Sequence, residues 1–182
     1  MKENKYDDNI FFQKYSQMSR SQQGLAGAGE WETLRKLLPD FKDKRVLDLG
    51  CGYGWHCIYA MEHGASSVVG VDISHKMLEV AKEKTHFPQV EYKCCAIEDV
   101  EFPEESFDVI LSSLAFHYVA DYEILVKKIY RILKSGGKLV FTVEHPVFTA
   151  YGTQDWHYIC TFAMPCYDFR LFSNCNTKIS EK

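Results

Sequence analysis

Glycines occupy every second position from 50 to 54, shortly after an acid, and this pattern allows a small ligand to come close to the backbone. An apolar stretch leads into Asp48, and Gly50, Gly52 and Gly54 follow it, with Cys51 inside the turn. The order is typical of a strand, a tight turn and the start of a helix. Glycine matters there because a side chain would hold the ligand off the backbone. These residue types predict a cofactor site of the nucleotide-binding kind.

A second acid helps to define the ligand class. Asp72 lies 22 positions after Gly50, near the spacing expected for a carboxylate that accepts from ribose hydroxyls. Dinucleotide sites prefer G-x-G-x-x-G, in which a helix N-terminus faces a pyrophosphate. This chain has G-x-G-x-G instead, and Asp48 before it would repel a pyrophosphate. The pattern therefore favours a ligand that carries an ammonium and a sulfonium, although Asp72 alone does not discriminate.

Strand patterns alternate with helical patterns along most of the chain. Strands are predicted at 45–49, 67–72, 90–94, 107–112 and 138–143. Helices are predicted from Trp31 to Leu38, at 55–63, after a Ser74 cap, and from Leu125 to the glycines at 136 and 137. This alternation predicts an α/β, Rossmann-like, doubly wound and mostly parallel sheet with helices on both faces. Ligands of such sheets bind at the carboxyl ends of the strands.

Four segments, taken in order, resemble the motifs of class I S-adenosylmethionine-dependent methyltransferases. They are Val46–Gly54, Val69–Ser74, Phe107–Ser113 and Leu133–Gly137. The resemblance covers about residues 30–147 and is closest to the small-molecule branch with the type 11 methyltransferase domain. It implies S-adenosylmethionine as the cofactor and S-adenosylhomocysteine as the product.

The resemblance also implies roles for individual residues. Asp48 and the Gly50, Cys51, Gly52 and Gly54 turn would line the methionine and ribose side. The remaining expected cofactor residues are Asp72 at the ribose, Ile73 on the adenine, Ala96, Ile97 and Glu98 at the adenine edge, and Ser112 near the methionine part. Many relatives have an aspartate for the adenine amino group where this chain has Ala96, so Glu98 or the backbone would replace it.

Methyl transfer needs alignment of the acceptor and exclusion of water, and a general base only where the acceptor keeps its proton. His117 and Tyr118 follow the fourth predicted strand and are the candidate catalytic residues. The alternative for His117 is a structural histidine. Glu144 and His145 follow the fifth strand, where shaping of a turn is the favoured reading. No C-x-x-C pair is present, so no metal site is predicted.

Residues 1–28 are predicted to form an N-terminal lid over the cofactor, with a disordered tail as the alternative. A helix is expected from Asp8 to Met18, and a loop at 19–29. Arg20 would meet the cofactor carboxylate, or else lie solvated. Trp55 and His56 begin the first crossover helix, where packing is the safer prediction for Trp55.

The methyltransferase domain is expected at 29–147, followed by an irregular tail at 148–182. The antiparallel strand pair that usually ends this fold is predicted to be missing or divergent, which suggests a shortened or altered version of a longer protein. An uncovered fifth strand would invite pairing with another chain, so a homodimer through this open sheet edge is one expectation.

Composition limits the partners. The net charge of −4 provides no basic field for nucleic acid. No apolar run approaches the length of a membrane span and the N-terminus is polar, so neither a membrane protein nor a signal peptide is predicted. Seven irregularly spaced cysteines favour reduced thiols and a cytoplasmic location. The leading hypothesis is methyl transfer to a small-molecule acceptor. The alternatives are a cofactor-binding protein or inactive remnant without turnover and, less favoured, a nicotinamide oxidoreductase.

Overall fold

A five-stranded sheet, parallel throughout, forms the centre of the fold. The computed structural model describes residues 4–144. The strands are β1 Arg45–Leu49, β2 Ser67–Asp72, β3 Val90–Cys94, β4 Phe107–Ser113 and β5 Leu133–Thr142, in the order β3-β2-β1-β4-β5. The predicted α/β class and the mostly parallel sheet are confirmed. The expected tail at 148–182 and His145 lie outside the described residues.

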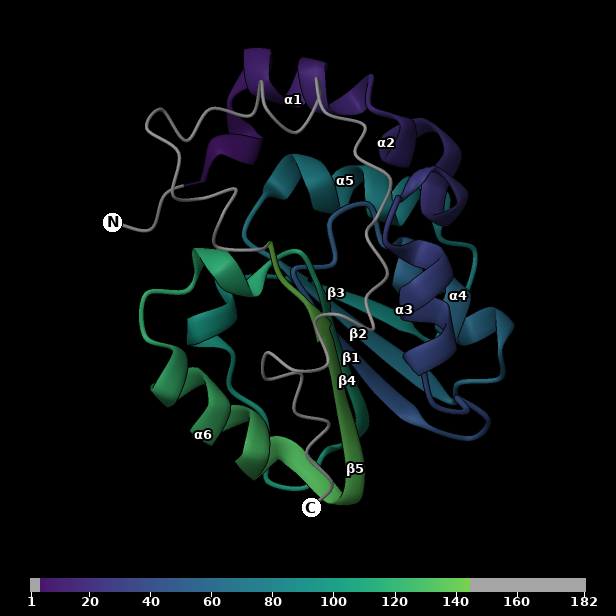
Figure 1. The fold of residues 1–182 in the computed structure, drawn as a ribbon, viewed down its shortest axis with the longest axis vertical. Coiled ribbons are helices and arrows are strands. Elements are labelled where there is room, and N and C mark those ends of the chain that lie inside the picture. Colours follow the sequence, from purple (N-terminus) through teal and green to yellow (C-terminus); the bar gives the residue numbers. More distant parts are fainter. Residues whose placement is uncertain (1–3, 145–182) are drawn as a thin grey trace.

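Helices cover both faces of the sheet (Figure 1). They are α1 Asn9–Ser16, α2 Ser19–Gln23, α3 Trp31–Leu37, α4 Trp55–Glu62, α5 His75–Lys84 and α6 Tyr122–Ile132. Short 3-10 turns lie at η1 Lys5–Asp7, η2 Gly24–Gly27, η3 Ile97–Asp99 and η4 Phe116–Tyr118. Within residues 4–144, none of the helices has the length and apolar character needed to cross a membrane.

Two apolar clusters explain the layers. One cluster contains Trp31 and Leu34 of α3, Ala60 of α4 and Leu78 of α5 together with one side of the sheet. The other joins the opposite side of the sheet to α6 through Leu125, Ile129 and Ile132, which recur at helical spacing. The sheet is therefore buried on both faces, as expected of parallel strands.

Strand order reverses beside β1, which pairs with β2 on one side and β4 on the other. The chain runs outward from β1 to β3 and then returns to begin β4. A crevice forms at such a reversal, beyond the carboxyl ends of the strands. The ends of β1, β2 and β4 are therefore the place to look for a site, and α1 and α2 lie above them in Figure 1.

Two local predictions were wrong. The segment predicted as a loop at 19–29 contains α2 and η2, because tertiary packing orders it: a Cβ on Gly24 would lie 3.1 Å from the Trp55 ring. The fifth strand begins at Leu133 rather than at 138. Buried Leu133 pairs with Phe107, and a register shift in the ladder takes up the glycine-containing stretch that was expected to be a turn.

Candidate functional site

The glycine turn joins the end of β1 to the end of β2. The backbone N–H groups of Gly50 and Cys51 donate to the Val71 carbonyl at 2.8 and 2.9 Å. Gly50, Gly52 and Gly54 have φ values of +80°, +52° and +74°, in the left-handed region that favours glycine. The sequence-predicted turn is thus present, and its conformation requires glycine at all three positions.

The three glycines differ in what surrounds them. A Cβ on Gly50 would meet Ala115 at 2.3 Å, and one on Gly54 would meet the Tyr92 hydroxyl at 2.2 Å. Both positions are closed by packing. Apart from Gly52 and its two chain neighbours, no atom of the described residues lies within 4 Å of the corresponding position on Gly52. Gly52 is therefore where a ligand can come against the backbone.

Asp72 is held beside that open position. Its carboxylate accepts from the N–H of Gly52 at 2.8 Å and from the N–H of Ser74 at 2.9 Å. Burial is the main cause that raises its pKa, and the two backbone donors lower it. Ser74 also caps α5, since its hydroxyl accepts from the Met77 N–H at 3.2 Å. The acid expected at the ribose thus has a fixed direction next to Gly52.

Asp48 lies beneath the turn rather than at the mouth of the site. It is 1% exposed, and its Oδ2 accepts from the Cys57 thiol at 3.5 Å. Its Oδ1 is buried and has no hydrogen-bond partner within residues 4–144. Burial raises the pKa of Asp48 to about 7. A buried carboxylate with one unpaired oxygen is costly, so the site is suited to a ligand that brings positive charge or a donor.

The N-terminal segment is fastened across the strand ends. The Asp7 carboxylate accepts from the Ser74 hydroxyl at 2.6 Å and from the Lys76 N–H at 3.1 Å, directly after Asp72. Asn4 donates to the Ile73 carbonyl at 3.2 Å. The sequence did not predict this attachment, because no local motif marks Asp7 as a partner of α5.

Tyrosine rings fill the space under the segment. Tyr6 and Tyr15 meet edge to face at 5.4 Å, and Tyr15 meets Tyr53 at 5.7 Å. Burial raises the pKa of Tyr15, and the charged groups that act on it are Arg20, Asp72 and Glu30. The Tyr15 phenol is therefore within electrostatic reach of both Asp72 and the Arg20–Glu30 pair.

Arg20 forms an ion pair with Glu30, whose side chain is only 14% exposed. Glu30 also accepts from the Ser113 hydroxyl at 3.2 Å, at the end of β4. His56 at the start of α4 is influenced by both charges, and burial lowers its pKa to about 4, so its ring is neutral at pH 7. Sequence reasoning singled out Arg20 but missed Glu30, which carries no motif.

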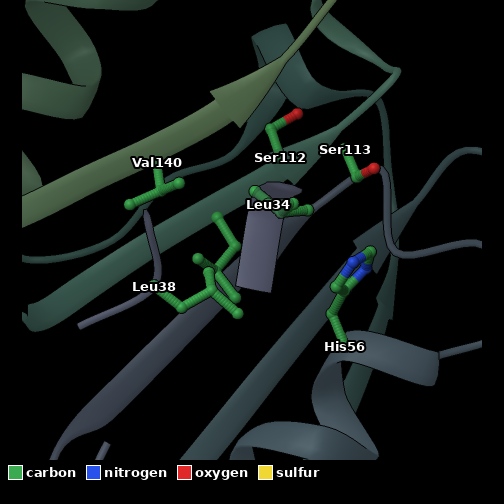
Figure 2. A pocket seen from close by; sticks show the side chains of 7 residues that line it. Leu34, Leu38, His56, Ser112, Ser113 and Val140 are labelled. Carbon is green, nitrogen blue, oxygen red and sulfur yellow. The ribbon is translucent and has the colours of Figure 1, made fainter. Parts of the chain in front are cut away.

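A narrow pocket opens between α3, the start of α4 and the ends of β4 and β5. Figure 2 shows the His56 ring and the Ser113 side chain at one end, and Leu38 and Val140 at the other. Leu34, Leu111 and Ser112 complete the lining. The pocket is apolar over most of its length and polar where it adjoins the Glu30 cluster.

The residues expected near adenine lie on the β3 side of the turn. Ala96 is buried, and Ile97 begins η3 and lies 3.5 Å from where a Gly50 Cβ would be. The Glu98 carbonyl accepts from Lys128 of α6 at 2.8 Å, which anchors η3. On the other side, the Ser112 hydroxyl donates to the Leu49 carbonyl at 2.8 Å and so ties β4 to β1.

The two candidate catalytic residues lie on η4. Both ring nitrogens of His117 are buried and lack a hydrogen-bond partner within residues 4–144. Burial lowers the pKa of His117, and Glu144 opposes that shift. Tyr118 is 56% exposed, and its hydroxyl lies 3.4 Å from that of Tyr6. Tyr118 thus lies beside Tyr6 of the N-terminal segment, and neither ring nitrogen of His117 has a partner among the residues that the structure describes.

Comparisons with known proteins agree with this geometry. A family model described as a methyltransferase domain matches residues 47–141. A crystal structure of an assigned S-adenosylmethionine dependent methyltransferase from Listeria monocytogenes is 58% identical, with a TM-score of 0.67, over 70% of this chain and 60% of that chain.

Two curated relatives carry named activities. A ubiquinone biosynthesis O-methyltransferase from Coxiella burnetii is 36% identical over 60% of this chain and 47% of its own length. Phosphoethanolamine N-methyltransferase 3 from Arabidopsis thaliana is 33% identical over 66% of this chain and 26% of its own length. The chain therefore spans about half or less of the length of these two relatives.

Proposed function

Because the chain belongs to the methyltransferase-domain family of class I S-adenosylmethionine-dependent methyltransferases, we propose that it transfers a methyl group to a small-molecule acceptor by in-line displacement. The observation that carries the proposal is the pairing of open space at Gly52 with the fixed carboxylate of Asp72. The unpaired, buried oxygen of Asp48 fits the same cofactor, which carries two positive centres.

The proposed cofactor contacts follow the shape of the site from end to end. Asp72 takes the ribose hydroxyls, and Asp48 acts on the ammonium through its charge. Arg20 takes the carboxylate of the amino-acid end. The remaining contacts are Ile73, Ala96, Ile97 and Glu98 around adenine, the backbone of Gly50, Cys51, Gly52 and Gly54 along the turn, and Ser112 near the methionine part.

The chain's own contribution is alignment and exclusion of water. When bound, the cofactor supplies a methyl group that its sulfonium has already activated. Positioning of two reactants in one site is worth roughly 7–11 kcal/mol. The hydrogen bond between Asp7 and Ser74 holds the N-terminal segment in place. With the packed rings of Tyr6 and Tyr15, this segment would close the reacting centre against solvent.

His117 is the proposed general base for an acceptor that keeps its proton. A base must be neutral at working pH, and burial favours the neutral ring of His117. Neither of its ring nitrogens has a hydrogen-bond partner within residues 4–144, so an acceptor that enters beside the ring would meet a nitrogen free to accept its proton. Tyr118, whose ring lies 4.2 Å from that of His117, would help to orient the acceptor.

A small acceptor is supported by the two named relatives, a ubiquinone biosynthesis O-methyltransferase and a phosphoethanolamine N-methyltransferase. A net charge of −4 is consistent with the expectation that nucleic acid is not the acceptor.

We further propose a cytoplasmic location, since Cys51 and Cys57 are buried free thiols. A homodimer through β5 is a further proposal, because β5 is the edge strand of the sheet formed by residues 4–144.

Calorimetric titration with S-adenosylmethionine tests cofactor binding. Asp72→Asn should weaken binding at least tenfold, because a ribose contact is lost and one backbone donor loses its partner. The exposed carboxylate of Glu79 on α5 provides a matched control, and Glu79→Gln should bind like the unchanged chain. Equal weak heats in all three proteins would contradict the proposal.

A second candidate function is cofactor binding without turnover, which is favoured by the burial of both ring nitrogens of the candidate base His117. Incubation with methyl-labelled cofactor and a panel of phenols, amines and phospho-amines separates the two. The leading proposal predicts a labelled product from at least one class. Tight binding with no labelled product throughout would favour the second candidate.

A further inference from the structure

Glu30 connects the lid to the end of the sheet. It directly precedes α3, and its Oε1 accepts from both the Arg20 guanidinium and the Ser113 hydroxyl. Arg20 belongs to α2 and Ser113 ends β4, 83 positions away from Glu30. One largely buried carboxylate thus fixes the relative position of a lid side chain and a strand end.

The hydrogen bonds that reach Glu30 have a single direction. The Leu114 N–H donates to the Thr142 hydroxyl at 3.1 Å, which donates to the Ser113 hydroxyl at 3.2 Å, which in turn donates to Glu30. Each hydroxyl has only one proton to give, so the series must end on a group that accepts. An ionised carboxylate meets that need and accepts from Arg20 as well.

The backbone beneath Arg20 is also fixed. The Ser21 hydroxyl donates to the Tyr15 carbonyl at 2.7 Å, and Gly24 packs against the Trp55 ring. A Cβ on Gly27 would lie 2.4 Å from the Ser19 carbonyl oxygen, so α2 and η2 pack without room for change. With the helix held, the remaining freedom is the direction of the guanidinium, and Glu30 sets it.

We infer that Glu30 is a positioning residue that holds the Arg20 guanidinium toward the carboxylate at the amino-acid end of S-adenosylmethionine. The inference rests on the proposed function. A guanidinium has five N–H donors, so pairing with Glu30 leaves others for a ligand carboxylate. The Arg20–Glu30 pair adjoins Ser113 at the carboxyl end of β4, whereas Asp72, the proposed ribose contact, lies at the carboxyl end of β2, on the other side of β1.

Two ligands that differ only at the amino-acid end provide the test. S-adenosylhomocysteine has that end, whereas 5′-methylthioadenosine keeps the adenosine and thioether without it. Glu30→Gln keeps the size of the side chain and removes its charge. It should weaken S-adenosylhomocysteine binding about tenfold, as expected when a charged hydrogen-bond partner is lost, and change 5′-methylthioadenosine binding less than twofold. Calorimetry on the full chain measures both dissociation constants.

Two further variants keep the test decisive if Glu30→Gln folds poorly, which thermal unfolding will show. Ser113→Ala retains the Glu30 charge and should weaken S-adenosylhomocysteine alone, by a smaller factor. Glu32→Gln, on the exposed side of α3, should change neither ligand. Equal weakening of both ligands by Glu30→Gln, or no weakening, would overturn the inference and leave the proposed function standing. An unchanged chain that binds neither ligand would overturn both.

Discussion

Among single residues, the three glycines of the turn are required for different structural reasons. Gly50 and Gly54 are required by packing against Ala115 and Tyr92, whereas Gly52 borders open space. All three have positive φ, so any side chain there costs conformational energy. The sequence pattern alone treats them as equivalent, because the difference lies in neighbours that are distant along the chain.

Alanine substitutions at Gly52 and Gly54 should distinguish a role in ligand binding from a role in packing. Gly52→Ala should cost about 1–2 kcal/mol of stability from its positive φ and should weaken S-adenosylmethionine binding at least tenfold, since the methyl group enters the ligand's space. Gly54→Ala should destabilise the fold further, because its methyl group collides with the Tyr92 hydroxyl. Denaturant unfolding and calorimetry measure the two effects. Unchanged binding by Gly52→Ala would contradict the assignment of the open space.

Because the Asp48 carboxyl group is buried, we expect the free energy of unfolding to depend on pH in an unusual way. Burial raises its folded pKa from 3.8 to about 7, so the folded state binds more protons than the unfolded state between these values. Its contribution to the free energy of unfolding therefore falls as pH rises from about 4 to about 7, and is constant above. Asp48→Asn should remove this slope and be relatively more stable at pH 8 than at pH 5, when each is compared with the unchanged chain.

Unfolding by urea at both pH values provides the measurement, and the difference between the two proteins isolates the contribution of Asp48. If Asp48 acts on the cofactor ammonium as proposed, the same variant should also bind S-adenosylmethionine more weakly, because that negative charge is lost. A difference in stability that does not vary with pH would show that Asp48 is ionised throughout this range.

The proposed role of His117 as general base leads us to expect a particular pH profile for turnover. As a base it must be neutral, so kcat/KM should fall as pH drops through its pKa, which burial holds below the usual 6.5. His117→Gln should lower kcat by roughly 10²–10⁴-fold and remove that acid limb, typical of the loss of a general base. Binding of S-adenosylhomocysteine should stay within twofold. Retained activity with the same acid limb would assign the base elsewhere.

At the scale of elements, the lid is the part whose position depends most on a few contacts. Asp7 joins η1 to the start of α5 through Ser74, His75 and Lys76, and these bonds lower the pKa of Asp7 although its partial burial opposes them. An attachment built from so few bonds can open without unfolding of the sheet.

Asp7→Ala should therefore raise the hydrogen-exchange rate of α1 amides and speed proteolysis before α3, while the global unfolding free energy changes by less than about 1 kcal/mol. Glu83→Ala, on an exposed position of α5, is the matched control and should change neither. Exchange rates in α1 equal to those of the unchanged chain would show that the tyrosine packing alone holds the lid.

The sequence predicted those elements that depend mainly on residues close together in the chain. The five strands, the Ser74 cap and the carboxyl-end location of Asp72 follow from apolar runs, a capping residue and topology. The α2 helix and the start of β5 were missed, because both depend on packing against residues far along the chain. Glu30 was missed for the same reason, since its partner Ser113 is 83 positions away.

At the scale of the whole molecule, two covered sheet faces leave the carboxyl edge as the place where a ligand can enter. The reversal of strand order beside β1 opens that edge, and the N-terminal segment lies across it (Figure 1). Asp72 lies at the end of β2 on one side of β1, and the Arg20–Glu30 pair adjoins the end of β4 on the other side. We propose that this separation suits an elongated ligand with a ribose at one end and an amino-acid group at the other.

A crystal structure of the chain with bound S-adenosylhomocysteine would test the proposed site. We expect ribose hydroxyls within hydrogen-bond distance of the Asp72 carboxylate, the Gly52 backbone against the ligand, and the amino-acid carboxylate at Arg20. Ligand density away from the Gly52 turn, or a ribose that makes no contact with Asp72, would contradict it.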